Sequence, residues 1–152
     1  MRAVLDRLFG RAVAAKFTLR AAKPEDLPVL SVILAECTKA AHWNPADFFA
    51  YSCDVAVLDG YVAGFVVWRE TYPGETEILN LAVQARFRRR GVAVALLRSV
   101  IRAHPGEIFL EVRQSNKAAR RLYHSLGFEE AGIRPEYYEE PPEAAIVMRI
   151  LS

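Results

Sequence analysis

The sequence lacks the features that would indicate a disulfide framework, a metal centre or a membrane anchor. Its 152 residues include only two cysteines, Cys37 and Cys53, with no Cys-x-x-Cys pair and no histidines nearby at zinc-binding spacing. Isolated cysteines are typical of reduced thiols in a cytoplasmic protein, so we expect neither a metal site nor a disulfide. No apolar run approaches the roughly 18 residues of a membrane-spanning helix, and the N-terminus has no signal-peptide pattern. We therefore expect a cytoplasmic protein that is neither exported nor bound to a membrane.

A strong charge imbalance is also missing. The 20 Lys and Arg residues nearly balance the 18 Asp and Glu residues, which gives a formal net charge of +2. Such a mild excess argues against a nucleic-acid-binding face, although a local group of arginines at 86 and 88–90 could still hold a phosphate-bearing ligand. Hydrophobic residues make up 53% of the chain and charged residues 25%, proportions that at this length predict one globular domain.

The first 16 residues have the pattern of an amphipathic extension ahead of a domain at 17–152. Leu5, Leu8, Phe9 and Val13 recur at helical spacing, with polar and basic residues on the other face, while Gly10 weakens the helix. We predict a short helix over 3–15 that packs on the domain. The alternative is a helix that binds a partner or a membrane surface.

The rest of the chain predicts a mixed α/β domain. We expect strands at 16–20, 55–58, 62–68, 77–83, 108–112 and 145–150, and helices at 24–39, 92–103 and 115–126. Asp59-Gly60 between two apolar runs favours a tight hairpin turn. In this interpretation the domain ends in strand, helix, strand, without internal repeats.

A basic loop between a predicted strand and a predicted helix has the form of an anion-binding site. The strand at 79–83 (LNLAV) leads into RRRGVA at 88–93. The first turn of a helix offers unpaired amide hydrogens and a partial positive charge, and a glycine there lets a pyrophosphate approach the backbone. The Gly-Lys-Ser/Thr of a Walker loop and the three glycines of a dinucleotide fingerprint are both absent, which disfavours nucleoside triphosphates and NAD.

The R-x-x-G-x-A spacing in this loop resembles the coenzyme A signature of the GNAT acetyltransferase superfamily. The later segments LEVRQSN at 110–116 and LYHSLGF at 122–128 resemble the ribosomal-protein-alanine N-acetyltransferases, the RimI type within that superfamily. The likeness extends over about residues 17–150. It implies the acyl-CoA N-acyltransferase fold, a central mixed, mostly antiparallel sheet flanked by helices, with acetyl-CoA as co-substrate.

The resemblance also implies which residues bind the cofactor. The backbone of 81–83 would bind the pantetheine arm, with a Val83 amide polarising the thioester carbonyl, and residues 89–94 would hold the pyrophosphate. The implied positions are Leu81, Ala82, Val83, Arg88, Arg89, Arg90, Gly91, Val92, Ala93, Val94 and Asn116. Ala93 and Val94 depart from the family, in which a second glycine and an arginine are common. This departure bears on affinity for the cofactor.

Acetyl transfer to an amine requires a base, because an α-amino group with a pKa of about 7.7 to 8.0 is mostly protonated at neutral pH. By resemblance this base is Glu111, and the acid that protonates the leaving sulfur is Tyr123. From the residues alone, Glu111 is equally a surface carboxylate paired with Arg113, and Tyr123 a core tyrosine on a helical stripe. Asn116 likewise fits either a cofactor contact or a helix cap.

The acceptor is indicated by aromatic residues and by resemblance. Trp43, Tyr137 and Tyr138 resemble the family's substrate-side aromatics, which implies a protein N-terminus as acceptor, including the alanine terminus of a ribosomal protein. Lysine side chains, polyamines and other small amines remain alternative acceptors. A non-catalytic acyl-CoA sensor or nucleic-acid-binding domain is the alternative class. Four glutamates fit either the amine entrance or a solvated surface: Glu77, Glu139, Glu140 and Glu143.

Overall fold

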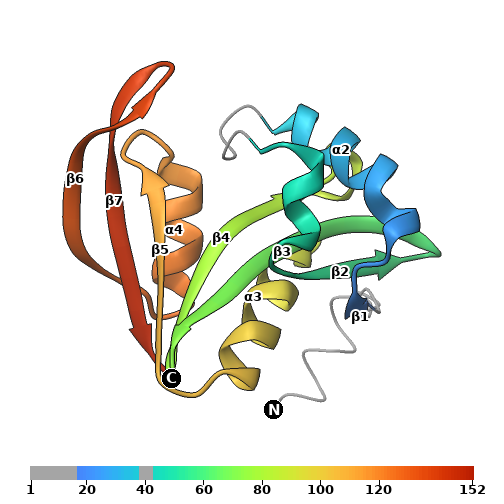
Figure 1. Ribbon diagram of the computed structural model, residues 1–152, viewed down its shortest axis with the longest axis horizontal. Helices are drawn as coiled ribbons and strands as arrows, with labels where there is room; N and C mark the ends of the chain where they lie inside the picture. Colours follow the sequence, from blue (N-terminus) through green and yellow to red (C-terminus); the bar gives the residue numbers. More distant parts are fainter. Residues whose placement is uncertain (1–16, 38–42) are drawn as a thin grey trace, which may run out of the picture.

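The computed structural model describes residues 17–37 and 43–152 and is built around one twisted sheet (Figure 1). The strand order is β1-β2-β3-β4-β5-β7-β6, and all neighbours are antiparallel except β4 and β5. The strands are β1 Thr18–Ala21, β2 Ser52–Leu58, β3 Tyr61–Tyr72, β4 Glu75–Val83, β5 Glu107–Arg113, β6 Glu129–Glu139 and β7 Pro142–Leu151. This arrangement confirms the mixed, mostly antiparallel sheet expected from the sequence. The predicted helix at 3–15 lies outside the described residues.

Helices cover both faces of the sheet. The α-helices are α2 Leu27–Glu36, α3 Val92–Ala103 and α4 Lys117–Ser125, and the 3-10 helices are η1 Pro24–Asp26, η2 Pro45–Phe49 and η3 Ala85–Phe87. Helices α3 and α4 pack on one face, where Leu96 and Leu97 join a large apolar cluster. Helix α2 and η2 pack on the other, where Leu30 and Phe48 are fully buried. In the described segments, no helix is long and apolar enough to cross a bilayer.

Several elements differ from the sequence prediction. The helix expected at 24–39 begins as the 3-10 turn η1, and α2 ends at Glu36. Helix α4 begins at Lys117, two residues later than predicted, because Asn116 caps it. Strand β6 was not predicted, and the expected strand-helix-strand ending was therefore wrong. All β6 residues except Tyr138 are exposed, so this strand has no alternating apolar pattern.

Strands β4 and β5 pair only at one end and then separate. Their parallel pairing covers Glu75 to Ile78 with Glu107 to Leu110, after which β4 continues to Val83 and β5 to Arg113. A β-bulge lies where they part, because Ile78 is opposite Trp68 and Asn80 is opposite Val67, which leaves Leu79 without a partner on β3. Figure 1 shows the two strands diverging from their paired ends. The opening exposes one edge of β4 over its last residues.

Candidate active site

A cavity of about 640 Å³ occupies the opening between β4 and β5. Its walls come from both strands, α4, the start of α3, the end of α2 and strand β6. The predicted site residues that line it are Trp43, Leu81, Ala82, Val83, Arg88, Ala93, Glu111, Asn116, Tyr123, Tyr137 and Tyr138. Residues from distant parts of the sequence therefore meet in one place. Arg89, Arg90, Gly91, Val92 and Val94 do not line the cavity itself.

The start of α3 has the geometry of an anion-binding site. Gly91 precedes the helix in the left-handed conformation, with φ of 81°, and neither a capping side chain nor an acidic residue is present in the first turn. The amide of Ala95 donates to the carbonyl of Gly91 at 3.0 Å. The amides of residues 92–94 therefore precede the first intrahelical bond and have no helical acceptor. Val92 reaches an anion only through its backbone, because its side chain is buried in the core.

The arginines of the loop before α3 carry positive charge without acidic partners. Within the described residues, none of Arg86, Arg88, Arg89 and Arg90 has a carboxylate within salt-bridge distance. Arg86 and Arg90 lie over the ring of Phe87. This uncompensated charge beside free helix amides suits a phosphate-bearing ligand.

Arg88 ties the same loop to the cavity. Its Nε donates to the carbonyl of Val83 at 3.3 Å, and its Nη2 donates to the Sγ of Cys37 at 3.4 Å. The Cys37 thiol in turn donates to the Val83 carbonyl at 3.8 Å. Arg88 thus joins the end of β4, the end of α2 and the basic loop at one corner of the cavity.

The open edge of β4 presents backbone groups at alternate residues. Gln84 donates its amide to the carbonyl of Ala63 on the β3 side at 2.7 Å. Because bonding alternates along an antiparallel ladder, Ala82 also directs its amide and carbonyl toward β3, whereas Leu81 and Val83 direct theirs toward the opening. Two of the three predicted backbone contacts are therefore available to a ligand: Leu81 through its N–H and C=O groups, and Val83 through its N–H, because the Val83 carbonyl accepts from Arg88 and Cys37. Ala82 lines the cavity but offers no backbone N–H or C=O group to a ligand.

Helix α4 contributes Asn116 and Tyr123. The Oδ1 of Asn116 accepts a hydrogen bond from the amide of Ala119 at 3.2 Å, so Asn116 is a helix cap that also lines the cavity. Tyr123 is 8% exposed and packs edge-on against Phe128, with ring centroids 5.8 Å apart. Burial raises the pKa of Tyr123 well above its usual range. Its phenol is therefore protonated at neutral pH and can act as a hydrogen-bond or proton donor.

Glu111 is held by strand β6. The Nε of Arg134 lies 2.9 Å from a carboxylate oxygen of Glu111, whose side chain is only 11% exposed. Hydrogen bonding to Glu111, together with partial burial, raises the pKa of Tyr137 to about 12. Arg113, the partner that the sequence suggested, instead donates to the carbonyls of Glu140 and Pro141. The predicted alternative pairing of Glu111 with Arg113 is therefore wrong.

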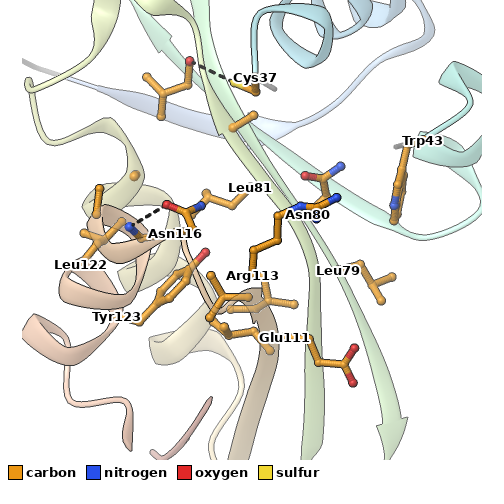
Figure 2. Close-up of a pocket in the computed structure, with 18 of the residues that line it drawn as sticks. Cys37, Trp43, Leu79, Asn80, Leu81, Glu111, Arg113, Asn116, Leu122 and Tyr123 are labelled. Atoms are coloured by element: carbon orange, nitrogen blue, oxygen red, sulfur yellow. Dashed lines mark hydrogen bonds between the residues drawn. The ribbon is translucent and has the colours of Figure 1, made fainter. Parts of the chain in front are cut away.

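The two predicted catalytic groups lie on opposite sides of the cavity. Figure 2 shows the hydroxyl of Tyr123 directed toward Asn116 and Leu81, and the carboxylate of Glu111 directed the other way, on the side of Leu79. Tyr123 thus belongs with the end of the cavity near α3, and Glu111 with the end near β6. An acid for a leaving group and a base for an incoming group require this separation.

Aromatic side chains form part of the cavity wall. Trp43 packs with Phe48 and Tyr51 at centroid distances of 5.9 and 5.7 Å. Tyr137 and Tyr138 meet edge to face at 5.1 Å. The guanidinium of Arg113 lies 4.1 Å from the ring centre of Tyr138 and fixes it against β5. Phe48 is fully buried, so it supports this wall from the core.

Of the four glutamates that fitted either an amine entrance or a solvated surface, Glu77 lines the cavity. It forms an ion pair with Arg69 at 2.6 Å. Glu143 accepts a hydrogen bond from the amide of Ser115, and this contact, with Arg113, lowers its pKa. These contacts attach β7 to the end of β5 and to the turn before α4.

Sequence reasoning missed several cavity residues: Glu36, Cys37, Asn80 and Arg113. Asn80 and Arg113 lie beside recognised positions on β4 and β5, and the closeness in sequence was an available signal. Cys37, predicted only to be a reduced thiol, contacts Arg88 and the end of β4. In the described part of the chain, no group of three or more His, Cys, Asp or Glu residues could hold a metal ion.

Comparisons with known proteins match this arrangement. The family model for the acetyltransferase (GNAT) family matches residues 3–128. The chain is 35% identical over 107 residues to the N-alpha-acetyltransferase RimI of Mycobacterium tuberculosis, which covers 70% of this chain and 67% of that protein. It is 38% identical over 98 residues to the ribosomal protein bS18-alanine N-acetyltransferase of Escherichia coli. This match covers 60% of this chain and 66% of that protein. An uncharacterized Mycobacterium leprae protein is 41% identical over 106 residues, covering 66% of this chain and only 29% of that protein.

Solved structures share the fold over nearly the whole chain. The ribosomal-protein-S18-alanine N-acetyltransferase of Escherichia coli superposes with a TM-score of 0.74 at 31% identity, covering 89% of this chain and 93% of that one. Ard1 from Thermoplasma volcanium superposes with a TM-score of 0.80 at 31% identity, covering 92% and 99%. On the family match and the shared fold, the chain belongs to the acetyltransferase (GNAT) family.

Proposed function

We propose that this protein transfers the acetyl group of acetyl-CoA directly to the α-amino group of a protein N-terminus. One observation carries the proposal: a single cavity reaches from the start of α3, past the protonated phenol of Tyr123, to the Glu111 carboxylate, and has aromatic side chains in its wall. A pyrophosphate-bearing donor fits the first end and a cationic amine the second. The names of the relatives in M. tuberculosis and E. coli support an N-terminal acceptor.

The residues present fit coenzyme A, which would supply an activated acetyl thioester. The amides of residues 92–94 and the guanidinium groups of Arg88 and Arg89 would hold the pyrophosphate, since they have neither helical acceptors nor acidic partners among the described residues. The outward N–H and C=O groups of Leu81 would bond the pantetheine arm as an added strand, and the Val83 amide would face the thioester carbonyl. Asn116 would contact the same arm from α4.

Glu111 would remove a proton from the acceptor amine, directly or through one water, as the amine nitrogen bonds to the acetyl carbon. The Val83 amide would stabilise the negative charge that develops on the carbonyl oxygen. Tyr123 would donate its hydroxyl proton to the sulfur as the carbon–sulfur bond breaks. A protonated acceptor amine gives up two protons in all. One leaves through Glu111, and the second, from the nitrogen of the adduct, restores the Tyr123 phenol after that phenol has protonated the sulfur, so the net products are the amide, the free thiol of CoA and one proton.

The proposed acceptor class is a peptide terminus, with the alanine terminus of a ribosomal protein as one candidate. Trp43, Tyr137 and Tyr138 would line the channel for the first residues of the peptide. Ribosomal proteins are made in the cytoplasm, so this acceptor implies a cytoplasmic location.

The test is an acceptor panel. Purified protein is incubated with acetyl-CoA and alanine-terminal basic peptides, N-terminally blocked lysine peptides or polyamines, and thiol release and product mass are measured. Acetylation of the peptide α-amine supports the proposal. Acetylation of lysine or polyamine alone would keep the transferase and overturn the acceptor, and no thiol release with any amine would overturn the activity.

A further inference from the structure

Asn80, in the wall of the cavity, has a buried side-chain amide without a hydrogen-bond partner among the described residues. Its side chain lines the cavity, the residue is 5% exposed, and its Nδ2 has no hydrogen-bond partner within the described part of the chain. Buried polar groups are nearly always paired, because an unpaired donor loses its bond to water without compensation. An unpaired amide in a ligand cavity therefore points to an acceptor that a ligand brings.

The β-bulge explains why Asn80 can face the acceptor side. Leu79 is the extra residue, which shifts the alternation of side chains along β4. Figure 2 shows Asn80 on the side of the strand toward Trp43, whereas Leu81 points to the opposite side, toward Asn116. The backbone of Asn80 pairs with Val67 on β3, so the side chain is what this residue offers to the cavity.

Asn80 also lies between the two ends of the proposed reaction. Val83, the proposed oxyanion donor, is three residues further along β4. The last residue pair between the parallel strands β4 and β5 is Ile78 with Leu110. Leu79 follows Ile78 as Glu111 follows Leu110, so the residue before Asn80 lies level with Glu111. The side chain of Asn80 is therefore beside the position that the reacting amine and the atoms attached to it would occupy.

An α-amine differs chemically from a side-chain amine in those attached atoms. In a peptide terminus the first carbonyl oxygen is three bonds from the amine nitrogen, so both atoms fit within one small volume. In lysine or a polyamine, the atoms at that distance are methylene groups, which cannot accept a hydrogen bond. A buried amide donor beside the amine would consequently favour the peptide terminus and be left unpaired by the other amines.

We propose that the Asn80 Nδ2 donates a hydrogen bond to the first carbonyl oxygen of the acceptor peptide and thereby selects α-amino groups over side-chain amines. This assignment rests on the proposed function, since it specifies how an N-terminal peptide is recognised. Asn80 then acts as a specificity-determining residue and takes no part in proton transfer.

Gln84 provides a matched control. Its Oε1 is also buried and without a partner among the described residues, but Gln84 does not line the cavity. Replacing either residue by Leu removes the side-chain amide and keeps a side chain of similar size. Only the replacement at position 80 should change the choice of acceptor.

The experiment compares an alanine-terminal peptide with the same peptide carrying a trans-alkene in place of its first peptide bond, which keeps the shape and removes the carbonyl. For the wild type we expect kcat/KM to be at least about tenfold higher on the amide peptide. Asn80→Leu should lower kcat/KM on the amide peptide about tenfold or more and leave the alkene peptide within about twofold. Gln84→Leu should keep the wild-type ratio.

Thermal unfolding and the acetyl-CoA dissociation constant, measured for each variant, establish that the fold and cofactor site are intact. If Asn80→Leu fails to fold, Asn80→Ala gives the same comparison with a smaller side chain. Equal losses of kcat/KM on both peptides, or any other result that keeps the wild-type ratio between them, would overturn the role of Asn80 in acceptor choice. The Asn80 amide would then be a structural group that bonds to water. Acetylation of lysine peptides but of neither terminal amine by the wild type would instead overturn the proposed function, and the Asn80 assignment with it.

Discussion

The carboxylate of Glu111 on β5 and the guanidinium of Arg134 on β6 form an ion pair with an N···O distance of 2.9 Å. The pair crosses β7, which lies between the two strands in the sheet. Arg134 is 58% exposed while Glu111 is 11% exposed, so the contact adds little to stability but fixes the direction of the carboxylate. The cavity thus contains a carboxylate whose orientation depends on the last hairpin of the chain.

Glu111→Gln should lower kcat by about 10²–10⁴-fold, the usual contribution of a general base, while the dissociation constant of acetyl-CoA stays within about twofold. The remaining rate should rise about tenfold per pH unit up to the α-amine pKa of about 7.7 to 8.0, because only amine that is already neutral can react. Steady-state rates from pH 6 to 9 measure both effects. A variant with the wild-type rate and pH profile would leave Glu111 a structural residue.

The same substitution should change the titration of Tyr137. Hydrogen bonding to the Glu111 carboxylate is the main reason that the pKa of Tyr137 is raised to about 12. Removing the negative charge should lower this pKa toward the ordinary tyrosine value of about 10. Phenolate absorbance or NMR of the tyrosine ring carbons follows the titration, and Tyr137→Phe identifies the signal. A Tyr137 pKa that remains near 12 in the variant would contradict the contact.

Tyr123→Phe should reduce kcat by about 10²–10⁴-fold if the phenol protonates the leaving sulfur, with the KM for acetyl-CoA nearly unchanged. The substitution keeps the ring and its contact with Phe128, so the melting temperature should change little. A large loss of acetyl-CoA affinity at unchanged kcat would mean that the hydroxyl binds the cofactor and does not serve as the acid. Single-turnover measurements of thiol release separate the chemical step from product release.

The sequence predicted helix α3 and the basic loop well, because a glycine before a strongly amphipathic segment is a local signal. Strand β6 was missed for a physical reason: it is an exposed edge strand with two register shifts, so burial imposes no alternation on its residues. Because β6 was not predicted, Arg134 on this strand was not predicted as the partner of Glu111. Adjacency along β5 suggested Arg113, whereas the observed partner, Arg134, comes from across the sheet.

The direction of the Asn80 side chain could not be predicted from the sequence pattern either. Its direction depends on the bulge at Leu79, which exists only in the pairing of β4 with β3. The identity of Tyr123 as a cavity residue came from family resemblance, since its helical stripe also fits a core tyrosine. Local pattern thus located the basic loop and the start of α3, while the Glu111 end of the cavity depends on contacts between distant strands.

Arg88→Gln should weaken acetyl-CoA binding by about tenfold, since it removes a charge without an acidic partner among the described residues. It also removes the bonds to Val83 and Cys37 that hold the loop. Arg98→Gln, an exposed position on α3 away from this cavity, is the matched control and should change the affinity less than twofold. Calorimetric titration at two salt concentrations measures both variants. Equal effects of the two substitutions would point to net charge alone.

Gly64→Ala should destabilise the protein by about 1–3 kcal/mol, the usual cost of overpacking. A Cβ at this position in β3 would lie 2.8 Å from the carbonyl oxygen of Ala82 and 3.1 Å from Val92, so β4 or α3 would have to move. Both elements carry proposed cofactor contacts, and acetyl-CoA affinity should fall with stability. Gly132→Ala is the control, because nothing lies within 4 Å of its Cβ and its φ is not positive, and it should stay within about 0.5 kcal/mol of the wild type. Urea unfolding with and without acetyl-CoA measures both the stability and the affinity for acetyl-CoA. If the Gly64→Ala protein is as stable as the Gly132→Ala protein, the close approach of β3 to β4 relaxes without a cost in free energy.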